Sequence, residues 1–321
     1  MKNKILIISG DPNSINSEII FKSLRKIDKN LLKRIYLISN YKLMKNQFRK
    51  LKLSNRLIKV KNIDEDIKEA GLKLLNIDLK FTNCFNVSQK ESSNFILSSL
   101  NYAHKLALRK DVKGIINCAI NKNLLKKSKT GVTEFLASKC AVKKNSEVML
   151  INNKKLSVCP ITTHINVSEI SKKINSSIIV NKVKTIQHWL KSQLKRKPKI
   201  AILGLNPHNG ELRKNSEEQN IIIPAILRLK KLGVKVKGPF ISDTIFINEY
   251  KNFDVIVGMY HDQVLAPYKT LFKFDAINIT LGLKYLRVSP DHGVAHNLIG
   301  KNKADETSLL KCINFINKFV K

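Results

Sequence analysis

The feature that most constrains this chain is a regular alternation of short apolar runs and longer helical patterns along its 321 residues. Short runs rich in Val and Ile that alternate with helices indicate an α/β fold with mainly parallel sheets. The expected strands are 4–9, 34–39, 114–120, 147–151, 155–160, 199–205, 234–238, 254–259 and 275–280, and the clearest expected helices are 91–109, 177–196, 217–232 and 305–320.

Glycine and proline are scarce and unevenly distributed. Residues 14–112 contain one glycine, Gly71, and no proline, whereas residues 200–300 contain eight glycines and five prolines. Special backbone geometry is therefore concentrated in the last third of the chain, where we expect the functional site.

The composition is that of a globular protein, with 43% hydrophobic and 26% charged residues. No apolar run approaches the roughly 18 residues that a membrane span requires, and the N-terminal MKNKILIISGD has too short an apolar run for a signal peptide. The five cysteines are scattered without CxxC spacing, which suits a reducing compartment and argues against a zinc ribbon. We therefore expect a cytoplasmic protein with no membrane partner.

The formal net charge of +35 admits two interpretations. Such a charge is typical of nucleic-acid binding. The basic residues, however, are mostly Lys, are spread along the whole chain and come with abundant Asn and Ile. Because Lys, Asn and Ile share codons rich in A and T, we favour a biased genome over a nucleic-acid partner. An attraction for small anions follows in either case.

Three histidines follow an apolar run and a turn: His164 in SVCPITTH, His208 in IAILGLNPH and His261 in VIVGMYH. In open parallel sheets, ligands gather beyond the carboxyl ends of the strands. Three imidazoles delivered there could converge on one divalent metal and leave positions open for a substrate. Each histidine alone would be interpreted as a hydrogen-bonded turn residue, so the prediction rests on their shared context.

A second group of candidates, Lys269, Asn278 and Arg287, lies nine residues apart in succession. A Lys, an amide and an Arg suit the recognition of a phosphate or a carboxylate, although each alone would be an ordinary surface residue. Neither the GxGxxG fingerprint nor a P-loop occurs, so a nucleotide cofactor would bind by other means.

Eight motifs occur in order along nearly the whole chain: ISGDPNSINSEI, TEFLA, TTHINVSEI, LGLNPHNGE, GPFISDTIF, MYHDQVLAPYK, INITLGL and VSPDHGVAHNLIGKNKAD. Together they resemble the 4-hydroxythreonine-4-phosphate dehydrogenases of pyridoxal phosphate biosynthesis. The resemblance implies two α/β/α domains like those of isocitrate and isopropylmalate dehydrogenases, with the active site in the interdomain cleft. We expect a first domain of residues 1–135 and 268–321 and a second of residues 136–267, in a homodimer with shared active sites.

The resemblance also implies roles for single residues. His164, His208 and His261 would bind one divalent cation (zinc, magnesium or cobalt), with His261 coming from the partner subunit. The implied contacts of the small phosphorylated substrate are Thr133, Lys269, Asn278 and Arg287. The candidates for catalytic acid and base are Asp243, Asp262 and His292. Thr133 is in addition the expected N-cap of a helix.

The implied reaction is the NAD- or NADP-linked oxidation of 4-phosphooxy-L-threonine to 2-amino-3-oxo-4-phosphooxybutanoate. This β-keto acid then loses carbon dioxide and yields 3-amino-2-oxopropyl phosphate. A divalent metal on the substrate hydroxyl would act as a Lewis acid while hydride leaves for the nicotinamide.

The chain departs from the pattern of the family at several positions. The usual GDPAGIGPE is GDPNSINSE, with Ser14 and Asn16 in place of two glycines, and the segment 122–131 is shorter than usual. The usual GHTE is GVTE, so Val132 replaces a histidine that contacts the substrate, and Val294 replaces a threonine. These departures leave two alternatives open: a related dehydrogenase of another phosphorylated hydroxy-amino acid, or a basic protein that has lost catalysis and binds polyanions.

Overall fold

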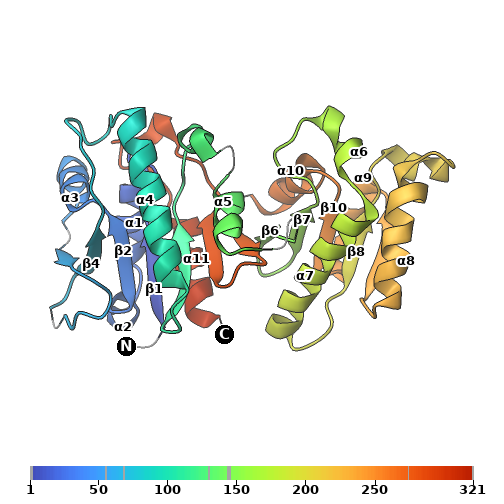
Figure 1. Cartoon of the computed structure of the whole chain (residues 1–321), viewed down its shortest axis with the longest axis horizontal. Helices are drawn as coiled ribbons and strands as arrows, with labels where there is room; N and C mark the ends of the chain where they lie inside the picture. Colours follow the sequence, from blue (N-terminus) through green and yellow to red (C-terminus); the bar gives the residue numbers. More distant parts are fainter. Residues whose placement is uncertain are drawn as a thin grey trace. The chain divides into compact units, whose positions relative to one another are not determined.

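The computed structural model describes residues 3–54, 56–67, 69–128, 131–142, 146–273 and 275–319 (Figure 1). The chain forms two compact units, Met1–Cys140 with Leu283–Lys321, and Ala141–Gly282. The divisions expected from the sequence lay at 135/136 and 267/268. Residues 268–282 belong instead to the second unit, because β11 pairs with a strand of that unit and α10 packs on two of its strands.

The first unit is built on a parallel sheet with the strand order β3-β4-β2-β1-β5-β12. Its strands are β1 (Lys4–Ile8), β2 (Ile35–Ser39), β3 (Leu57–Val60), β4 (Leu72–Asn76), β5 (Val112–Asn117) and β12 (Leu286–Pro290). Every residue of β1 and β2 is buried, as expected for central strands of a parallel sheet that is covered on both faces.

Helices of the first unit pack on this sheet: α4 contacts β1, β2 and β5, and α11 contacts β1, β5 and β12. Figure 1 shows α4 in front of the sheet, running roughly along the strands. The helices are α1 (Asn16–Leu24), α2 (Lys29–Leu32), α3 (Tyr41–Lys50), α4 (Gln89–Ala107), η1 (Lys122–Ser128), α5 (Val132–Lys139), η6 (His296–Leu298) and α11 (Thr307–Lys318).

The expected helix cap at Thr133 is wrong. The N-cap of α5 is Gly131, which has extended backbone angles, and the helix begins at Val132. Thr133 therefore lies in the first turn of α5, where its hydroxyl is free of the capping role and contacts a neighbouring strand instead, as described below.

The second unit is built on a mixed sheet with the order β11-β6-β7-β10-β8-β9. Strands β7, β10, β8 and β9 are parallel neighbours, and β6 is antiparallel to both β7 and β11. The strands are β6 (Val148–Asn152), β7 (Ser157–Pro160), β8 (Ile200–Leu203), β9 (Val236–Phe240), β10 (Val255–Gly258) and β11 (Ile277–Leu281).

In the second unit, α7 packs beside α8 and against β6 and β11, while α10 packs on β7 and β10. The α-helices are α6 (Ile170–Lys173), α7 (Ser176–Leu194), α8 (Ile223–Lys231), α9 (Ser242–Ile245) and α10 (His261–Phe272). The 3-10 and π turns are η2 (Val167–Glu169), η3 (Pro207–Leu212), η4 (Glu218–Ile222) and η5 (Glu249–Asn252).

The predicted α/β class with mainly parallel sheets is confirmed, but three strands were missed: β3, β4 and β12. Two of them carry a buried cation, Lys73 in β4 and Arg287 in β12, each only 3% exposed. Lys73 donates a hydrogen bond to the carbonyl of Lys33, and its ammonium lies 4.6 Å from the centre of the Tyr36 ring. A charged residue interrupts the apolar pattern, so the sequence of such a strand does not look buried. No helix among the described residues is both long and apolar enough to cross a membrane.

Candidate functional site

The three candidate metal ligands all lie in the second unit, beyond the carboxyl ends of neighbouring strands. His164 follows β7, His208 follows β8, and His261 is the first residue of α10, directly after β10. Because β10 pairs in parallel with both β7 and β8, the three segments leave the same edge of the sheet. The expectation that each histidine follows a strand is therefore confirmed.

Two of these histidines lie side by side. The ring centroids of His164 and His261 are 5.4 Å apart, with an angle of 41° between the planes. Nδ1 of His261 is 2.6 Å from Oδ1 of Asp262, a side chain that is itself largely exposed. A carboxylate on one imidazole nitrogen fixes the ring and leaves the other nitrogen for a ligand, which is the usual arrangement at a metal-binding histidine. The donor chemistry of this pair fits a divalent cation.

The third histidine lies on a separate turn. Within the part of the chain that the structure describes, no three His, Cys, Asp or Glu side chains are close enough together to hold a metal ion. The pair that lies together in one chain is His164 and His261, whereas the family resemblance paired His164 with His208. The described part of one chain thus brings together two of the three candidate histidines.

The turn that carries His208 has an unusual backbone. Five consecutive residues, 208–212, have φ between 51° and 58°, in the left-handed region. This conformation costs roughly 1–2 kcal/mol per residue for L-amino acids other than glycine, and only Gly210 escapes the penalty. Side chains elsewhere must hold such a turn in place, and strain of this kind is concentrated at functional sites.

The second group of candidates is distributed over both units. Lys269 is in the last turn of α10 and Asn278 is on β11, both in the second unit, whereas Arg287 is on β12 in the first. Oδ1 of Asn278 is buried and has no hydrogen-bond partner. A buried acceptor without a partner is costly, so this amide is suited to contact a ligand.

Arg287 is the best-defined candidate of the first unit. Its Nε donates to Oδ1 of Asn117 at 2.6 Å, and its NH1 donates to Oγ1 of Thr133 at 3.3 Å. The structure thus brings together two predicted substrate contacts, Thr133 and Arg287, at the carboxyl end of β5. Burial lowers the pKa of Arg287 to about 10, partly offset by the nearby carboxylate of Glu134, so the side chain remains a cation at neutral pH.

Val132, the main departure from the family, is next to Thr133 at the start of α5 and is half-buried. Its side chain can neither donate nor accept a hydrogen bond. The shortened segment 122–131 contains two candidates to replace the missing histidine, Lys127 and Lys129. Lys129 lies outside the described residues, as does the side chain of Lys127.

The three candidates for acid and base are spread over both units. Asp243 lies in α9 and Asp262 in α10, both exposed in the second unit, and His292 follows β12 in the first. Nδ1 of His292 contacts the carbonyl of Gly293 at 2.9 Å, while its Nε2 is buried without a hydrogen-bond partner. Asp262 contacts another candidate, His261.

Sequence analysis missed a polar cluster at the carboxyl end of β1. The Asp11 carboxylate is buried and accepts hydrogen bonds from the backbone of Asn13 and Asn121; burial raises its pKa above the ordinary value. Ser9 Oγ and Asn16 Oδ1 are buried there without hydrogen-bond partners. The GDPNSINSE motif was the signal that could have drawn attention to these residues.

The same loop holds the two residues that replace glycines of the family, Ser14 and Asn16. Asn16, which is 2% exposed, donates from Nδ2 to the carbonyl of Ala119 at 2.8 Å. The hydroxyl of Ser14 donates to the carbonyl of Asp11 and accepts from the backbone of Asn16. Both polar side chains are therefore built into the local structure.

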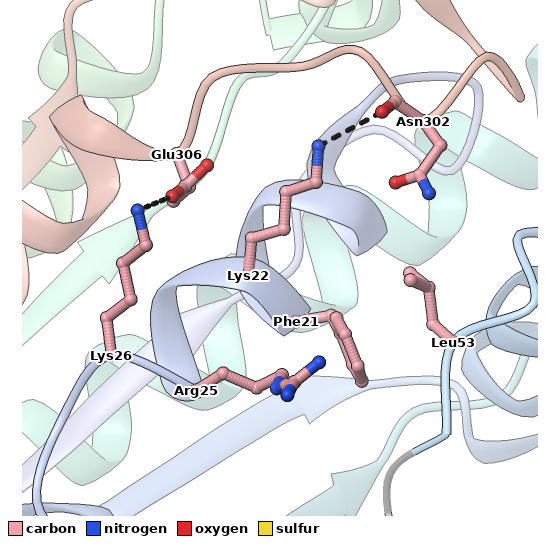
Figure 2. Close-up of a pocket in the computed structure, with 7 residues that line it drawn as sticks. All are labelled: Phe21, Lys22, Arg25, Lys26, Leu53, Asn302 and Glu306. Atoms are coloured by element: carbon pink, nitrogen blue, oxygen red, sulfur yellow. Dashed lines mark hydrogen bonds and ion pairs between the residues drawn. The ribbon is translucent and has the colours of Figure 1, made fainter.

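A hollow of about 520 Å³ lies elsewhere on the first unit (Figure 2). It is lined by Phe21, Lys22, Arg25, Lys26, Leu53, Asn302 and Glu306. Two of its cations already have acceptors: Lys26 forms an ion pair with Glu306, and Lys22 bonds to Glu18 and to the carbonyls of Asn302 and Ala304. None of the predicted site residues lines this hollow, and we do not assign the site to it.

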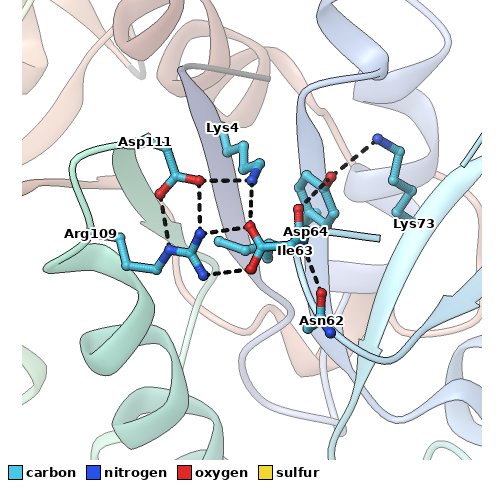
Figure 3. Close-up of polar contacts among 8 residues, drawn as sticks. Lys4, Asn62, Ile63, Asp64, Lys73, Arg109 and Asp111 are labelled. Carbon is cyan, nitrogen blue, oxygen red and sulfur yellow. Dashed lines mark hydrogen bonds and ion pairs between the residues drawn. The ribbon is translucent and has the colours of Figure 1, made fainter. Parts of the chain in front are cut away.

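A charged network lies where β1 begins, at the opposite end from the polar cluster (Figure 3). The Nζ of Lys4 is 2.7 Å from Asp111 and 3.2 Å from Asp64. Arg109 binds both carboxylates, with contacts of 2.6 Å to Asp64 and 3.0 Å to Asp111. Every charge in the network has a partner of opposite sign, so its role is to join β1 to the segments around it.

The fold occurs in known dehydrogenases. A β-decarboxylating dehydrogenase from Thermococcus kodakarensis has a TM-score of 0.51 at 10% sequence identity, covering 98% of this chain and 82% of that chain. At this identity the likeness concerns the fold alone, and it agrees with the fold expected from the sequence. The predicted fold is thus confirmed.

Sequence comparisons identify the family. The model of the family "Pyridoxal phosphate biosynthetic protein PdxA" matches residues 30–316, and the chain belongs to this family. A 4-hydroxythreonine-4-phosphate dehydrogenase from Sulfurihydrogenibium sp. (strain YO3AOP1) is 39% identical over 319 residues, covering 97% of this chain and 96% of the relative. The resemblance inferred from the motifs is therefore confirmed.

Two further relatives are similar over nearly the whole chain. The crystal structure of 4-hydroxythreonine-4-phosphate dehydrogenase from Klebsiella pneumoniae has a TM-score of 0.83 at 27% identity, covering 98% of both chains. A protein from Oceanobacillus iheyensis, provisionally named a D-threonate 4-phosphate dehydrogenase, is 32% identical over 318 residues, covering 96% of this chain and 95% of that protein. Relatives of similar identity thus carry names for two different phosphorylated substrates.

Proposed function

We propose that this protein oxidises 4-phosphooxy-L-threonine with NAD or NADP in the biosynthesis of pyridoxal phosphate. The secondary alcohol becomes a ketone, with hydride transferred to the nicotinamide and one proton released. The product, 2-amino-3-oxo-4-phosphooxybutanoate, then loses carbon dioxide and gives 3-amino-2-oxopropyl phosphate. The observation that carries the proposal is the adjacent pair His164 and His261, beside Asp262, in a chain of the PdxA family.

The imidazoles of His164, His208 and His261 would hold one divalent cation, zinc, magnesium or cobalt. When bound, it would supply a Lewis acid to the substrate hydroxyl. The residues of the chain have the remaining roles. Asp262 orients the ring of His261 through Nδ1, and Asp243, Asp262 and His292 are the proposed proton carriers.

Lys269 and Arg287 would bind the anionic ends of the substrate, with Thr133 and Asn278 providing neutral hydrogen bonds. Arg287 supports this role because Asn117 fixes its guanidinium from one side. A buried cation that is held in place recognises phosphate or carboxylate more strongly than a mobile one.

We also propose that the enzyme is a homodimer whose subunits share their active sites. The described part of one chain does not bring its three ligand histidines together, and a second chain could complete the set. If ligands are shared, a mixture of inactive His261→Ala and inactive His208→Ala chains should recover activity when subunits exchange. Active monomers would contradict the shared site. A cytoplasmic location is proposed as well, because the five cysteines are all buried and unpaired.

A second candidate function is the oxidation of another phosphorylated hydroxy acid. The observation that favours it is Val132, which places an aliphatic side chain next to the Thr133–Arg287 pair. D-Threonate 4-phosphate is one such substrate, since a relative from Oceanobacillus iheyensis carries that name. The two substrates differ in the group at carbon 2, an amine or a hydroxyl, so they can be compared directly.

The test is an assay of NADH and NADPH formation by the purified chain with 4-phosphooxy-L-threonine, or with D-threonate 4-phosphate, and added divalent metal. Turnover of the amino substrate at higher kcat/KM supports the first proposal, and a preference for D-threonate 4-phosphate supports the second. If neither substrate reduces a nicotinamide while the chain binds polyanions with a steep salt dependence, the protein is not this enzyme.

A further inference from the structure

The buried side chain of Gln263 joins three loops of the second unit. Its Oε1 accepts a hydrogen bond from the backbone N–H of Met259 at 2.6 Å. Its Nε2 donates to the carbonyl of Gly204 at 2.7 Å and to Oγ of Ser242 at 2.8 Å. Met259 begins the link from β10 to His261, Gly204 begins the loop from β8 to His208, and Ser242 is the first residue of α9, directly before Asp243. One amide thus ties together the segments that carry two candidate ligands and one candidate acid.

A second buried side chain, Glu218, binds the start of the left-handed turn. Its Oε1 accepts from the backbone N–H of Leu205 at 2.7 Å and of Asn206 at 2.8 Å, and its Oε2 accepts from Nδ2 of Asn206 at 3.0 Å. Glu218 is fully buried. Burial alone would raise the pKa of Glu218, but these hydrogen bonds outweigh it and hold the pKa below its usual value. The carboxylate is therefore charged and its acceptors are occupied.

The backbone near these side chains leaves room for them. A Cβ on Gly258 would lie 2.8 Å from Oε1 of Gln263 and 2.5 Å from Val264, and a Cβ on Gly204 would lie 3.1 Å from Oε1 of Glu218 and 2.1 Å from Oδ1 of Asn209. Both glycines lie where a strand ends and the segment that carries a candidate histidine begins: Gly204 after β8 and Gly258 at the end of β10. The strand ends and the two polar anchors are thus packed against one another.

Both anchors bind the segment that leads into a left-handed turn. Residues 208–212 are left-handed, which is unfavourable for the four that are not glycine. The amide of Asn209 gives one tether, donating from Nδ2 to the carbonyl of Pro239 at 3.0 Å. Glu218 and Gln263 supply the tethers at the start of the loop, at Gly204, Leu205 and Asn206.

We infer that Glu218 and Gln263 are positioning residues of the metal site: Glu218 holds the start of the loop that carries His208, and Gln263 ties that start to the segment that precedes His261. The inference rests on the proposed function, because it assumes that these histidines bind a divalent cation. Neither side chain touches the cation or the substrate; each acts through the ligands. Outer-shell partners of this kind typically change metal affinity 10- to 100-fold when they are replaced.

The test uses near-isosteric replacements in the full chain. In Glu218→Gln, one acceptor becomes an NH2 group that faces the donors of Leu205 or Asn206. In Gln263→Glu, an oxygen faces the carbonyl of Gly204 and the tie between the loops is lost. Co²⁺ affinity is measured by competition with a chromophoric chelator, on protein whose circular dichroism is native. We expect a 10- to 100-fold weaker affinity for each variant.

Two matched controls isolate the effect. Gln47→Glu removes an amide that donates to two backbone carbonyls, those of Pro12 and Cys84, in the first unit. Asp254→Asn changes a carboxylate that accepts a hydrogen bond from the backbone N–H of Lys199. Asp254 directly precedes β10, at the end of that strand away from His261. Both should lower thermal stability and leave Co²⁺ affinity within about twofold of the unsubstituted chain. Equal loss of affinity in the controls would overturn the inference.

A double-mutant cycle shows whether Glu218 acts through His208. In a His208→Ala background, Glu218→Gln should change Co²⁺ affinity by no more than about twofold, because the ligand that it positions is gone. Full additivity would contradict positioning. Should Glu218→Gln not fold, Asn206→Ala takes its place in the same cycle, since it removes the amide that bridges Glu217 and Glu218 and keeps the buried carboxylate.

The failures of the inference and of the proposed function are distinct. If the unsubstituted chain binds no Co²⁺ and forms no NADH, the proposed function fails and the inference with it. If the unsubstituted chain binds Co²⁺ and turns over, while Glu218→Gln and Gln263→Glu match its affinity, only the inference fails.

Discussion

The two ends of strand β1 differ in whether their polar side chains have partners. At its start, Lys4 is paired with both Asp64 and Asp111, and Arg109 closes the network. Just beyond its end, Ser9 Oγ has no hydrogen-bond partner, although it is buried. Four residues of the strand separate Lys4, whose charge is paired, from Ser9, whose hydroxyl has no partner.

The difference indicates which end is available for a ligand. A buried polar atom without a partner reduces stability, so a fold keeps such atoms where something else binds. The carboxyl edge of the first unit has several, including Asn16 Oδ1 and His292 Nε2. At the carboxyl edge of the second unit, Glu218 and Gln263 have their hydrogen bonds made, whereas Oδ1 of Asn209 is buried without a partner. The imidazoles of His164 and His261 lie side by side at the same edge. We therefore expect substitutions at carboxyl edges to affect function and those at the amino edge to affect stability.

The largest effect is expected at the imidazole pair. His164→Ala or His261→Ala should reduce turnover to background and lower the amount of bound divalent metal, because half of the adjacent pair is removed. Bound metal is measured by elemental analysis and turnover by NADH formation. His188→Ala is the matched control, since His188 is exposed on α7 and lies away from the pair in the sequence. Full activity of the unsubstituted chain after exhaustive chelation would contradict a metal role.

A smaller effect is expected at the buried guanidinium. Arg287→Lys keeps the charge but loses the forked geometry that binds Asn117 and Thr133 together. Loss of a charged hydrogen bond is worth roughly 1.5–3 kcal/mol, so kcat/KM should fall about tenfold or more. Arg34→Lys, which removes a guanidinium contact to Asn317, is the control and should leave kcat/KM unchanged. Unchanged kinetics in Arg287→Lys would mean that the residue only stabilises the fold.

A gain is expected at Val132. Replacement by histidine restores a hydrogen-bonding group beside Thr133, and KM for 4-phosphooxy-L-threonine should fall about tenfold if that substrate is the native one. Val132→Leu, which adds volume without a polar group, is the control. A rise in KM, or loss of activity in Val132→His alone, would favour the alternative in which the pocket has been rebuilt for another substrate.

The smallest effect is expected at the amino edge. Hydrogen bonds from Arg109 and Lys4 lower the pKa of Asp64 to about 2, below its usual 3.8. Because the folded value is the lower one, the stabilisation is complete above pH 4 and is lost as the pH falls toward 2. Urea midpoints measured between pH 5 and 2 should decline less for Asp64→Asn than for the unsubstituted chain. A parallel decline would show that the network does not contribute, as is common for exposed pairs.

Local patterns were enough to predict the α/β class and the position of each histidine after a strand. Both depend on short segments: the runs SVCP, IAIL and VIVG are apolar enough to be buried, and the turn residues after them are read directly from the chain. The family followed from motifs that occur in order. These inferences needed no knowledge of which segments meet.

Only the tertiary structure decided the strands β4 and β12, the partners of Arg287, and the anchors Glu218 and Gln263. In each case the burial of a polar residue depends on a hydrogen-bond partner in another segment: Gln263 is 59 residues from Gly204, and Arg287 is 170 residues from Asn117. A polar residue in an apolar run looks exposed unless its partner is known. The sequence by itself determined most of the strands and the position of each candidate histidine after a strand, because periodicity is local. The fold decided which polar groups are satisfied and which remain unpaired, because hydrogen-bond partners lie on other segments.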